Sequence, residues 1–271
     1  MAPPGSPSPP LRALEDLGRG TLRAVSSVGD GALLLLASLE WIALGRRRGQ
    51  AVRAAAVFSE MMQIGVRAVP IVSLLAATVG VMLAIQGIYQ LRRFGAEDQV
   101  VIGVAFGMTR EFAPLITGIL VAGRSGSALA ARLATMTISQ EVDALRVMGI
   151  NPVRFLVVPS LLAMLLVLPA LVVWADLVSL LAAGLYLSSE LGMTLQAYLL
   201  QTVDLLAPND VMHGVWKSLF FAVLVALIGI RDGAQVSGGA EGVGRVTTNA
   251  VVHGITAIVL TDMLFVFATT R

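Results

Sequence analysis

The sequence predicts an all-α membrane protein with about five transmembrane helices. Of its 271 residues, 56% are hydrophobic and 13% are charged, and the mean hydropathy is +0.84. A water-soluble domain of this length does not need so many apolar residues to fill one core. The chain has no cysteine, which excludes disulfides, thiolate nucleophiles and cysteine-ligated metals. Its net charge of +2 does not indicate nucleic acid as a partner.

The N-terminal part is predicted to lie outside the bilayer core. Residues 1–10 form a Pro/Ser/Gly tract without a basic residue or a following apolar run, which predicts a disordered tail rather than a signal peptide. Between 11 and 67, apolar stretches alternate with arginine, and the richest, 32–44, is too short to span comfortably. We expect cytoplasmic or interfacial amphipathic helices here. The arginines expected at headgroup level are Arg46, Arg47 and Arg48.

An alternative for the same region is one more transmembrane helix, from Val25 to Leu44. Such a helix would have to bury Asp30 and Glu40 in the bilayer. The sequence leaves this alternative open.

Five apolar segments after residue 67 are long enough to cross a bilayer as helices. They comprise residues 68–91, 99–123, 155–185, 211–230 and 248–268. The first is uncharged and has Pro70 in its first turn, where proline is tolerated. The third contains Asp176, and a glycine-rich connection separates the last two. Five spans place the two termini on opposite sides of the membrane.

The arginines indicate the orientation, because cytoplasmic loops of membrane proteins are enriched in Lys and Arg. An N-terminus in the cytoplasm places most of the basic residues inside and the C-terminus outside. Those inside are Arg12, Arg19, Arg23, Arg46, Arg47, Arg48, Arg53, Arg132, Arg146, Arg154, Arg231 and Arg245. Those toward the far side are Arg92, Arg93, Lys217 and Arg271.

The second span carries Arg110 and Glu111 side by side near its middle. A charge at the centre of a membrane helix costs about 3 kcal/mol on insertion scales, so it usually lines a cavity or meets a polar partner. Neighbouring helix positions point about 100° apart, so the two side chains do not satisfy each other simply by facing one another. At least one of them is expected to reach another helix. One interpretation is therefore a substrate site, and the other is an ion pair between helices that touches no substrate.

A short amphipathic helix is predicted between spans two and three, at 139–148. Val142, Leu145 and Met148 recur at helical spacing, and charged residues take the other faces. Permeases powered by a separate ATPase use such a helix to fit a groove in the nucleotide-binding subunit. The motif DALRVMG resembles the EAAxxxG signature of importers, with Asp143 in place of Glu. An ordinary loop helix is the alternative.

Several motifs in the same order carry a more specific resemblance. They are REFAPLITGILVAGRSGSALAARLATM, ISQEVDALRVMGINPVRFLVVPSLLA and SGGAEGVGRVTTNAVVHG, followed by Asp262 in the last span. Together they resemble the MlaE family of ABC-transporter permeases, which includes the YrbE proteins of MCE systems. The match covers 68–271, and it implies a homodimeric permease in a bacterial inner membrane.

The resemblance also implies partners and a substrate. The partners are a cytoplasmic ABC ATPase that binds ATP and magnesium, a periplasmic MCE-domain protein and a small accessory subunit, while this subunit holds no cofactor. The substrate is a phospholipid moved between the inner membrane and the MCE carrier, in a system that maintains outer-membrane lipid asymmetry. The implied ATPase-coupling residues are Glu141, Val142, Asp143, Ala144, Leu145 and Met148.

The implied lipid-binding residues are Arg110, Glu111, Lys217 and Gln86. Their chemistry suits a phospholipid, because a phosphate needs one or two cations within an apolar wall. Glu111 holds a cation in place or contacts a zwitterionic headgroup. Lys217 is alternatively a snorkelling residue, and Gln86 an ordinary interface anchor.

The two remaining acids of the spans, Asp176 and Asp262, are expected to serve packing or gating. The two histidines have no partners at metal-ligand spacing, so we assign no metal site. We also assign no catalytic residue. Small residues that recur every three or four positions predict close helix packing. They are Gly123, Gly126, Ala130 and Ala134.

Two rival functions remain. A secondary transporter of an amphipathic substrate would use an ion gradient, and its usual sign, inverted repeats, is not apparent. A membrane enzyme acting on lipid would need a catalytic constellation that these scattered acids do not offer.

Overall fold

The computed structural model describes residues 9–45 and 50–269, and every regular element in those ranges is helical. This confirms the all-α class. The predicted tail at 1–8 and the predicted headgroup-level arginines Arg46, Arg47 and Arg48 lie outside the described residues, as does Arg271. Residues 9 and 10, which the sequence assigned to the tail, begin the first helix.

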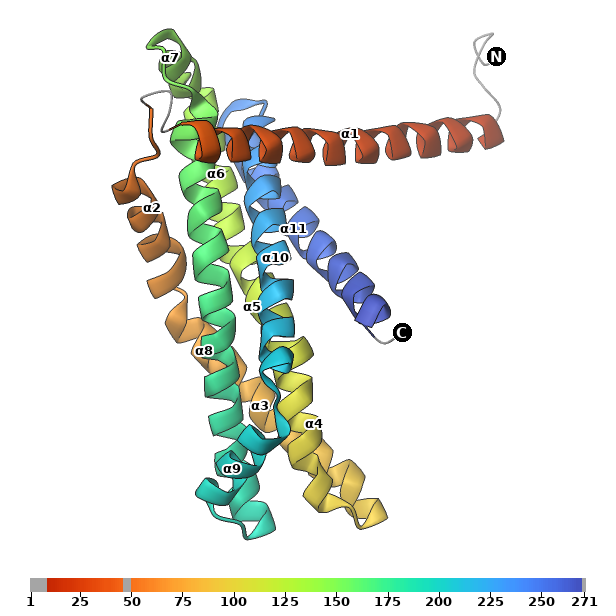
Figure 1. The fold of residues 1–271 in the computed structure, drawn as a ribbon. Coiled ribbons are helices and arrows are strands. Elements are labelled where there is room, and N and C mark those ends of the chain that lie inside the picture. Colours follow the sequence, from red (N-terminus) through yellow and green to blue (C-terminus); the bar gives the residue numbers. More distant parts are fainter. Residues whose placement is uncertain (1–8, 46–49, 270–271) are drawn as a thin grey trace.

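Five long helical runs build a bundle, together with a separate N-terminal helix (Figure 1). The elements are α1 (Pro9–Leu44), α2 (Ala54–Met61), α3 (Val69–Leu91), α4 (Val100–Gly107), α5 (Ala113–Val121), α6 (Ser127–Ile138), α7 (Glu141–Val147), α8 (Val158–Leu191), α9 (Leu195–Leu205), α10 (Pro208–Ala234) and α11 (Gly239–Thr269). Wider π-helical turns join some of these helices into continuous runs. The π-helical turns are η1 (Met62–Val66), η4 (Met108–Phe112), η5 (Ala122–Gly126) and η6 (Val153–Val157). Two 3₁₀ turns follow α3, namely η2 (Arg92–Phe94) and η3 (Glu97–Gln99).

The long runs extend beyond the spans expected from hydropathy. The first runs from Ala54 to Phe94, or 41 residues, which makes it about 60 Å long. The second continues through η4 and η5 to Ile138, past the expected end at Gly123. The hydrocarbon core is only about 30 Å thick, so these helices project from it. Hydropathy detects the apolar middle of such a helix and misses its amphipathic end.

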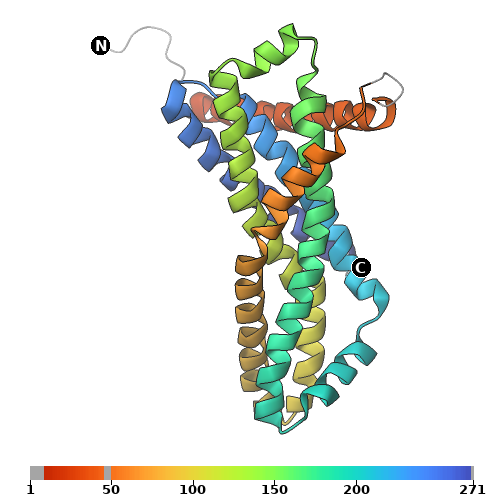
Figure 2. The ribbon, with the colours of Figure 1, turned by 90° about the vertical axis from the view of Figure 1, so that its left-hand side faces the viewer.

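Among the residues that the structure describes, six helices are long and apolar enough to cross a membrane, one more than the sequence favoured. The additional one is Val25–Leu44 in α1, of which only 6% is buried inside the chain. Figures 1 and 2 show α1 lying across one end of the bundle rather than along it. Asp30 keeps half of its side chain exposed and lies 3.6 Å from Arg231 of α10. This placement supports the interfacial interpretation.

The bundle has two distinct ends, which we call the α7 end and the α9 end. At the α7 end lie α1, α7 and the connection between α10 and α11 (Figures 1 and 2). At the α9 end lie α9 and the connection between α3 and α4. The connections that the sequence assigned to one side of the membrane therefore share one end of the molecule, whereas the C-terminal end of α11 lies partway along the bundle (Figure 1).

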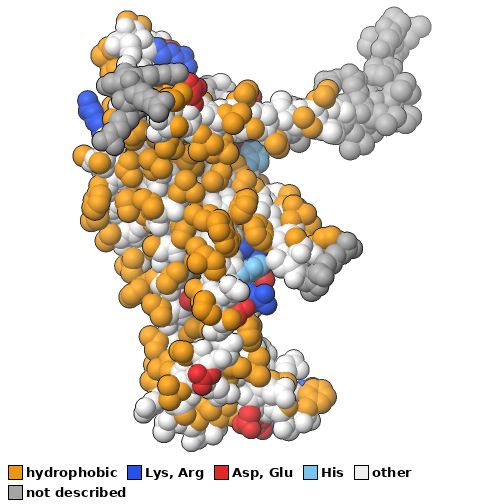
Figure 3. Space-filling model, viewed as in Figure 1, with side chains coloured by type: hydrophobic (Ala, Val, Ile, Leu, Met, Phe, Trp, Pro, Cys, Tyr) orange, Lys and Arg blue, Asp and Glu red, His pale blue; other side chains and the backbone are white. Residues whose placement is uncertain are grey.

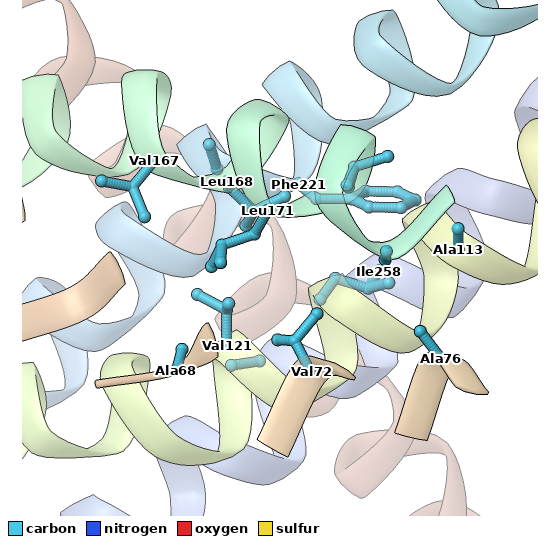
Figure 4. Packing of buried hydrophobic residues seen from close by; sticks show 14 of the residues in the cluster. Ala68, Val72, Ala76, Ala113, Val121, Val167, Leu168, Leu171, Phe221 and Ile258 are labelled. Carbon is cyan, nitrogen blue, oxygen red and sulfur yellow. The ribbon is translucent and has the colours of Figure 1, made fainter. Parts of the chain in front are cut away.

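Helix α8 lies at the centre of the packing, where it contacts α3, α10, α2 and α5. Aliphatic side chains from these helices converge around Leu168 and Leu171, both of which are at least 96% buried (Figure 4). Val72 from α3, Val121 from α5 and Phe221 from α10 reach the same region. The core thus holds the spans in fixed register and positions the charged side chains described below.

Of the small residues predicted to serve close packing, Gly126 and Ala130 lie directly against α10, whereas a Cβ atom added at Gly123 would have no neighbour within 4 Å. A Cβ atom added at Gly229 would lie 2.8 Å from the backbone oxygen of Gly126, and one added at Gly233 would lie 2.6 Å from that of Ala130. Real Cβ atoms do not approach so closely, so the two helices depend on glycine here.

The double variant Gly229→Ala/Gly233→Ala should therefore lower stability, by about 1–3 kcal/mol from overpacking against rigid backbone. The measurement is the melting temperature of the purified protein in detergent. A matched control is Gly103→Ala/Gly244→Ala, because a Cβ atom added at either of these positions would have no neighbour within 4 Å. Both pairs gain the same helix propensity, so equal melting temperatures would contradict the close-packing argument.

Candidate functional site

The π-helical turn η4 presents Arg110 and Glu111 on different faces of the second run. Pro114 follows in the first turn of α5 and has no N–H to donate to the carbonyl of Arg110. The wider turn relieves the clash between the proline ring and that carbonyl, and such turns recur at functional sites. The local sequence thus explains why the helix widens where its two charges lie.

Lys217 of α10 is fully buried and lies between two carboxylates from other helices. Its Nζ donates a hydrogen bond of 2.5 Å to Oε2 of Glu111, and it lies 3.0 Å from Oδ1 of Asp262 in α11. A buried ammonium requires such partners, because an unpaired charge in an apolar interior is costly. Lys217 is therefore a counter-ion that joins three runs of the bundle, as the ion-pair interpretation predicted, and it is not snorkelling to an interface.

Arg110 is the exposed cation of the site, with 44% of its side chain accessible. Its Nε lies 3.5 Å from Oδ1 of Asp210, whose other oxygen accepts a hydrogen bond from the backbone N–H of Ala207 at the start of α10. Within residues 9–45 and 50–269, no hydrogen bond or ion pair occupies its two terminal amino groups. Arg110 therefore has donors available to a ligand.

We call these five residues the ionic cluster, and they are Arg110, Glu111, Asp210, Lys217 and Asp262. Two cations face three carboxylates, so the cluster has a formal excess of one negative charge. In Figure 3, a group of basic, acidic and histidine side chains interrupts the hydrophobic surface beside the C-terminal end of α11.

An aromatic wall adjoins the ionic cluster. Phe265 of α11 meets Phe220 edge to face, with ring centroids 5.2 Å apart, and meets His213 in the same way at 6.2 Å. His213 precedes Lys217 by one helical turn on α10, within electrostatic reach of Arg110. The site thus combines fixed charges with an apolar surface.

The sequence analysis singled out three members of the ionic cluster and missed Asp210, which it placed in a connecting loop. It gave Asp262 only a packing or gating role. Gln86 is exposed on α3, and no hydrogen bond or ion pair in the described part of the chain links it to the cluster. The available signal was that two cations within the spans, Arg110 and Lys217, need more counter-ions than Glu111 alone.

The predicted amphipathic helix exists as α7, at the end of the second run. Leu145 is 8% exposed and turns inward, and Val142 packs beside the core. The outward surface instead carries Val147 and Met148, which are 89% and 64% exposed, and this role of Val147 was not predicted. The charged residues are also exposed, with Arg146 2.9 Å from Asp143 and the Ser139 hydroxyl donating to Glu141 at 2.8 Å.

Membrane-length helices with an ionic cluster set in an apolar surface define a multi-pass membrane protein. The family model of the permease MlaE matches residues 57–268, and the chain belongs to this family of ABC-transporter permeases. The resemblance inferred from the motifs is thereby confirmed.

Relatives agree with this assignment. A probable ABC transporter permease protein of Rickettsia prowazekii is 31% identical over 94% of this chain and 96% of its own length. One of a Synechocystis strain is 35% identical over 75% and 77%. The Arabidopsis thaliana protein TRIGALACTOSYLDIACYLGLYCEROL 1, chloroplastic, is 34% identical over 71% of this chain and 55% of its own.

Proposed function

We propose that this permease is the membrane subunit of an ATP-driven phospholipid transporter. It works as a homodimer in a bacterial inner membrane, with its N-terminus and α7 in the cytoplasm and its C-terminus in the periplasm. A separate ATPase supplies ATP and magnesium, and this subunit needs no cofactor of its own. A periplasmic MCE-domain protein and a small accessory subunit complete the system, which moves lipid between membrane and carrier and maintains outer-membrane asymmetry.

The ionic cluster is the observation that carries this proposal. A site for an inorganic ion needs no apolar wall, and a site for a pure hydrocarbon needs no charge. A phospholipid has both parts, so its phosphate pairs with the free donors of Arg110 while its tails lie against Phe220 and Phe265. The name of the Arabidopsis relative contains that of a diacylglycerol lipid, which supports a lipid substrate without indicating a phosphate.

The charge balance of the ionic cluster indicates which kind of phospholipid headgroup fits the site. With Lys217 neutralised by Glu111 and Asp262, the cluster is one negative charge in excess. A headgroup that carries both a phosphate and an ammonium satisfies Arg110 and a carboxylate together, whereas a singly anionic headgroup leaves a carboxylate unpaired. We therefore expect a zwitterionic phospholipid as the transported substrate.

The second run couples the site to the ATPase. The turn η4 and helix α6 belong to one continuous helical stretch, from Glu97 to Ile138, and α7 follows directly. A movement of α7 on nucleotide binding therefore reaches Arg110 through a rigid helix.

Arg110→Gln should abolish lipid contact while the protein stays folded. An exposed ion pair such as Arg110 with Asp210 contributes about 1 kcal/mol or less to stability. Removing a charged phosphate contact costs about 2–5 kcal/mol, which lowers lipid affinity tenfold or more. Photo-crosslinking to a phosphatidylethanolamine probe in the purified complex measures this loss.

The control is Arg92→Gln, which breaks a more exposed pair with Glu97 at the α9 end. Unchanged crosslinking in Arg110→Gln, with an intact dimer, would reject the headgroup site. Transport that continues without ATP but stops with a protonophore would instead favour the ion-gradient transporter.

A further inference from the structure

A second charged site lies away from the ionic cluster, toward the α7 end. Two adjoining cavities, of about 390 and 190 Å³, share Glu60, Gln63 and Arg132 in their walls. They lie where α2 and η1 meet η5, α6 and the start of α8, and Figure 2 shows α2 in front of α6 and α8. The larger cavity falls in the range of about 300–1,000 Å³ typical of small-ligand sites. We call the two together the arginine groove.

Five arginines and one acid line the arginine groove, leaving a formal excess of four positive charges. The arginines are Arg53, Arg67, Arg124, Arg132 and Arg154, and the acid is Glu60. Arg132 is held by Glu60 at 2.5 Å and by the Ser160 hydroxyl at 3.3 Å.

The other four arginines of the groove have no acidic partner among the described residues. Arg124 donates to the backbone oxygen of Ile64 at 3.4 Å. Arg53, Arg67 and Arg154 make no ion pair with any residue in the described ranges. The groove thus offers several guanidinium groups whose charges no acid in the described part of the chain neutralises.

Part of the wall is apolar. Ala56, Met136, Phe155 and Pro159 line the larger cavity beside Arg53 and Arg154. A free inorganic anion needs only the charges, whereas a lipid needs an apolar surface next to them for its glycerol and upper acyl carbons. Basic pockets between transmembrane helices on the cytoplasmic side bind phosphorylated headgroups in this way.

We propose that the arginine groove binds the phosphate-bearing headgroup of an anionic phospholipid from the leaflet at the α7 end. That leaflet is the cytoplasmic one if the orientation in the proposed function holds, but the binding itself does not depend on it. The groove and the ionic cluster differ in the sign of their excess charge. The groove therefore retains an anionic lipid and does not compete for the zwitterionic substrate.

Native mass spectrometry of the delipidated, purified complex tests this proposal without ATP or transport. Dioleoyl phosphatidylglycerol or dioleoyl phosphatidylcholine is titrated into the wild type and into Arg53→Gln/Arg154→Gln. We expect the wild type to prefer phosphatidylglycerol. The variant should lose about fivefold in affinity for phosphatidylglycerol for each arginine removed, because each basic residue near an anionic lipid contributes about 1 kcal/mol. The matched control, Arg92→Gln/Arg93→Gln, removes the same charge at the α9 end and should keep the preference.

Equal affinity of the wild type for both lipids, or equal losses in variant and control, would overturn the proposal. So would sn-glycerol 3-phosphate binding as tightly as the lipid, because the ligand would then be a soluble phosphate. Unchanged lipid binding with a weakened ATPase association would assign the groove to an acidic segment of the partner. If the double variant does not assemble, Arg67→Gln in the adjoining cavity gives the same comparison. Because no transport is measured, failure here leaves the proposed function untouched.

Discussion

Lys217→Met is expected to destabilise the protein by about 3 kcal/mol, the lower end of the range for a broken buried ion pair, because the largely buried Asp262 loses its cation while Glu111 is 37% exposed and stays partly hydrated. Methionine fills a similar volume, so lost charge rather than lost packing is responsible. Glu111 and Asp262 would face each other across the gap left by the ammonium. The measurement is the yield of folded protein and its melting temperature in detergent.

A triple variant separates the structural role of the cluster from its role in transport. Lys217→Met/Glu111→Gln/Asp262→Asn removes the cation together with both acids, so no buried charge stays unpaired, and stability should largely return. If the cluster also orients the headgroup, lipid transport by the reassembled complex stays low. A Lys217→Met protein as stable as the wild type would show that the two carboxylates do not need the ammonium.

The spans and the class of the protein were predictable because they depend on local composition. An apolar stretch long enough for a bilayer is visible in any window of the sequence. The partners of Lys217 were not predictable in the same way, because Glu111 lies 106 positions away and the register between the two helices arises from packing. Sequence alone identified the anomalous charges and left both a substrate site and an ion pair open.

The orientation of α1 illustrates the same limit. Its apolar stretch satisfies the length criterion for a span, although the richest part, 32–44, is short and the acids disfavour burial in lipid. The contact between Asp30 and Arg231 supports the interfacial interpretation, because it links α1 to α10 while α1 lies across the bundle (Figure 1). Neighbouring chemistry, rather than hydropathy, distinguishes a crossing helix from one that lies at the surface.

In helix α7, the amphipathic pattern predicted which residues share the apolar face, but it did not predict whether that face contacts the chain itself or a partner. Of the apolar stripe predicted at Val142, Leu145 and Met148, the first two form the face that packs on the chain itself, whereas Met148 is 64% exposed and lies on the other face. The face open to a partner is the other one, with Ala144 and Met148 beside the nearly fully exposed Val147. Val147, an apolar residue on the polar side of the helix, was the signal in the sequence for this exposed face.

Val147→Asp should therefore release the ATPase without unfolding the permease. An exposed side chain contributes little to the fold, but a central apolar contact in an interface contributes about 2 kcal/mol or more, which corresponds to roughly thirtyfold weaker association. Co-purification of the ATPase with the variant, in detergent, measures the loss. Leu145→Ala is the contrasting variant, because it should lower stability through a cavity under α7.

Reversing the charges at Glu141 and Asp143 to lysine should uncouple ATP hydrolysis from lipid movement. Both side chains are exposed, so the permease stays folded, while the reversed charges should disfavour the proposed docking of α7 on the ATPase. The control, Glu97→Lys/Asp98→Lys, makes the same charge change at the α9 end, where no ATPase is expected to bind. Coupled transport that survives the reversal at α7 would exclude these acids from the docking surface. The continuous helix from Ile138 back to Arg110 would then have to receive the ATPase signal through some other contact.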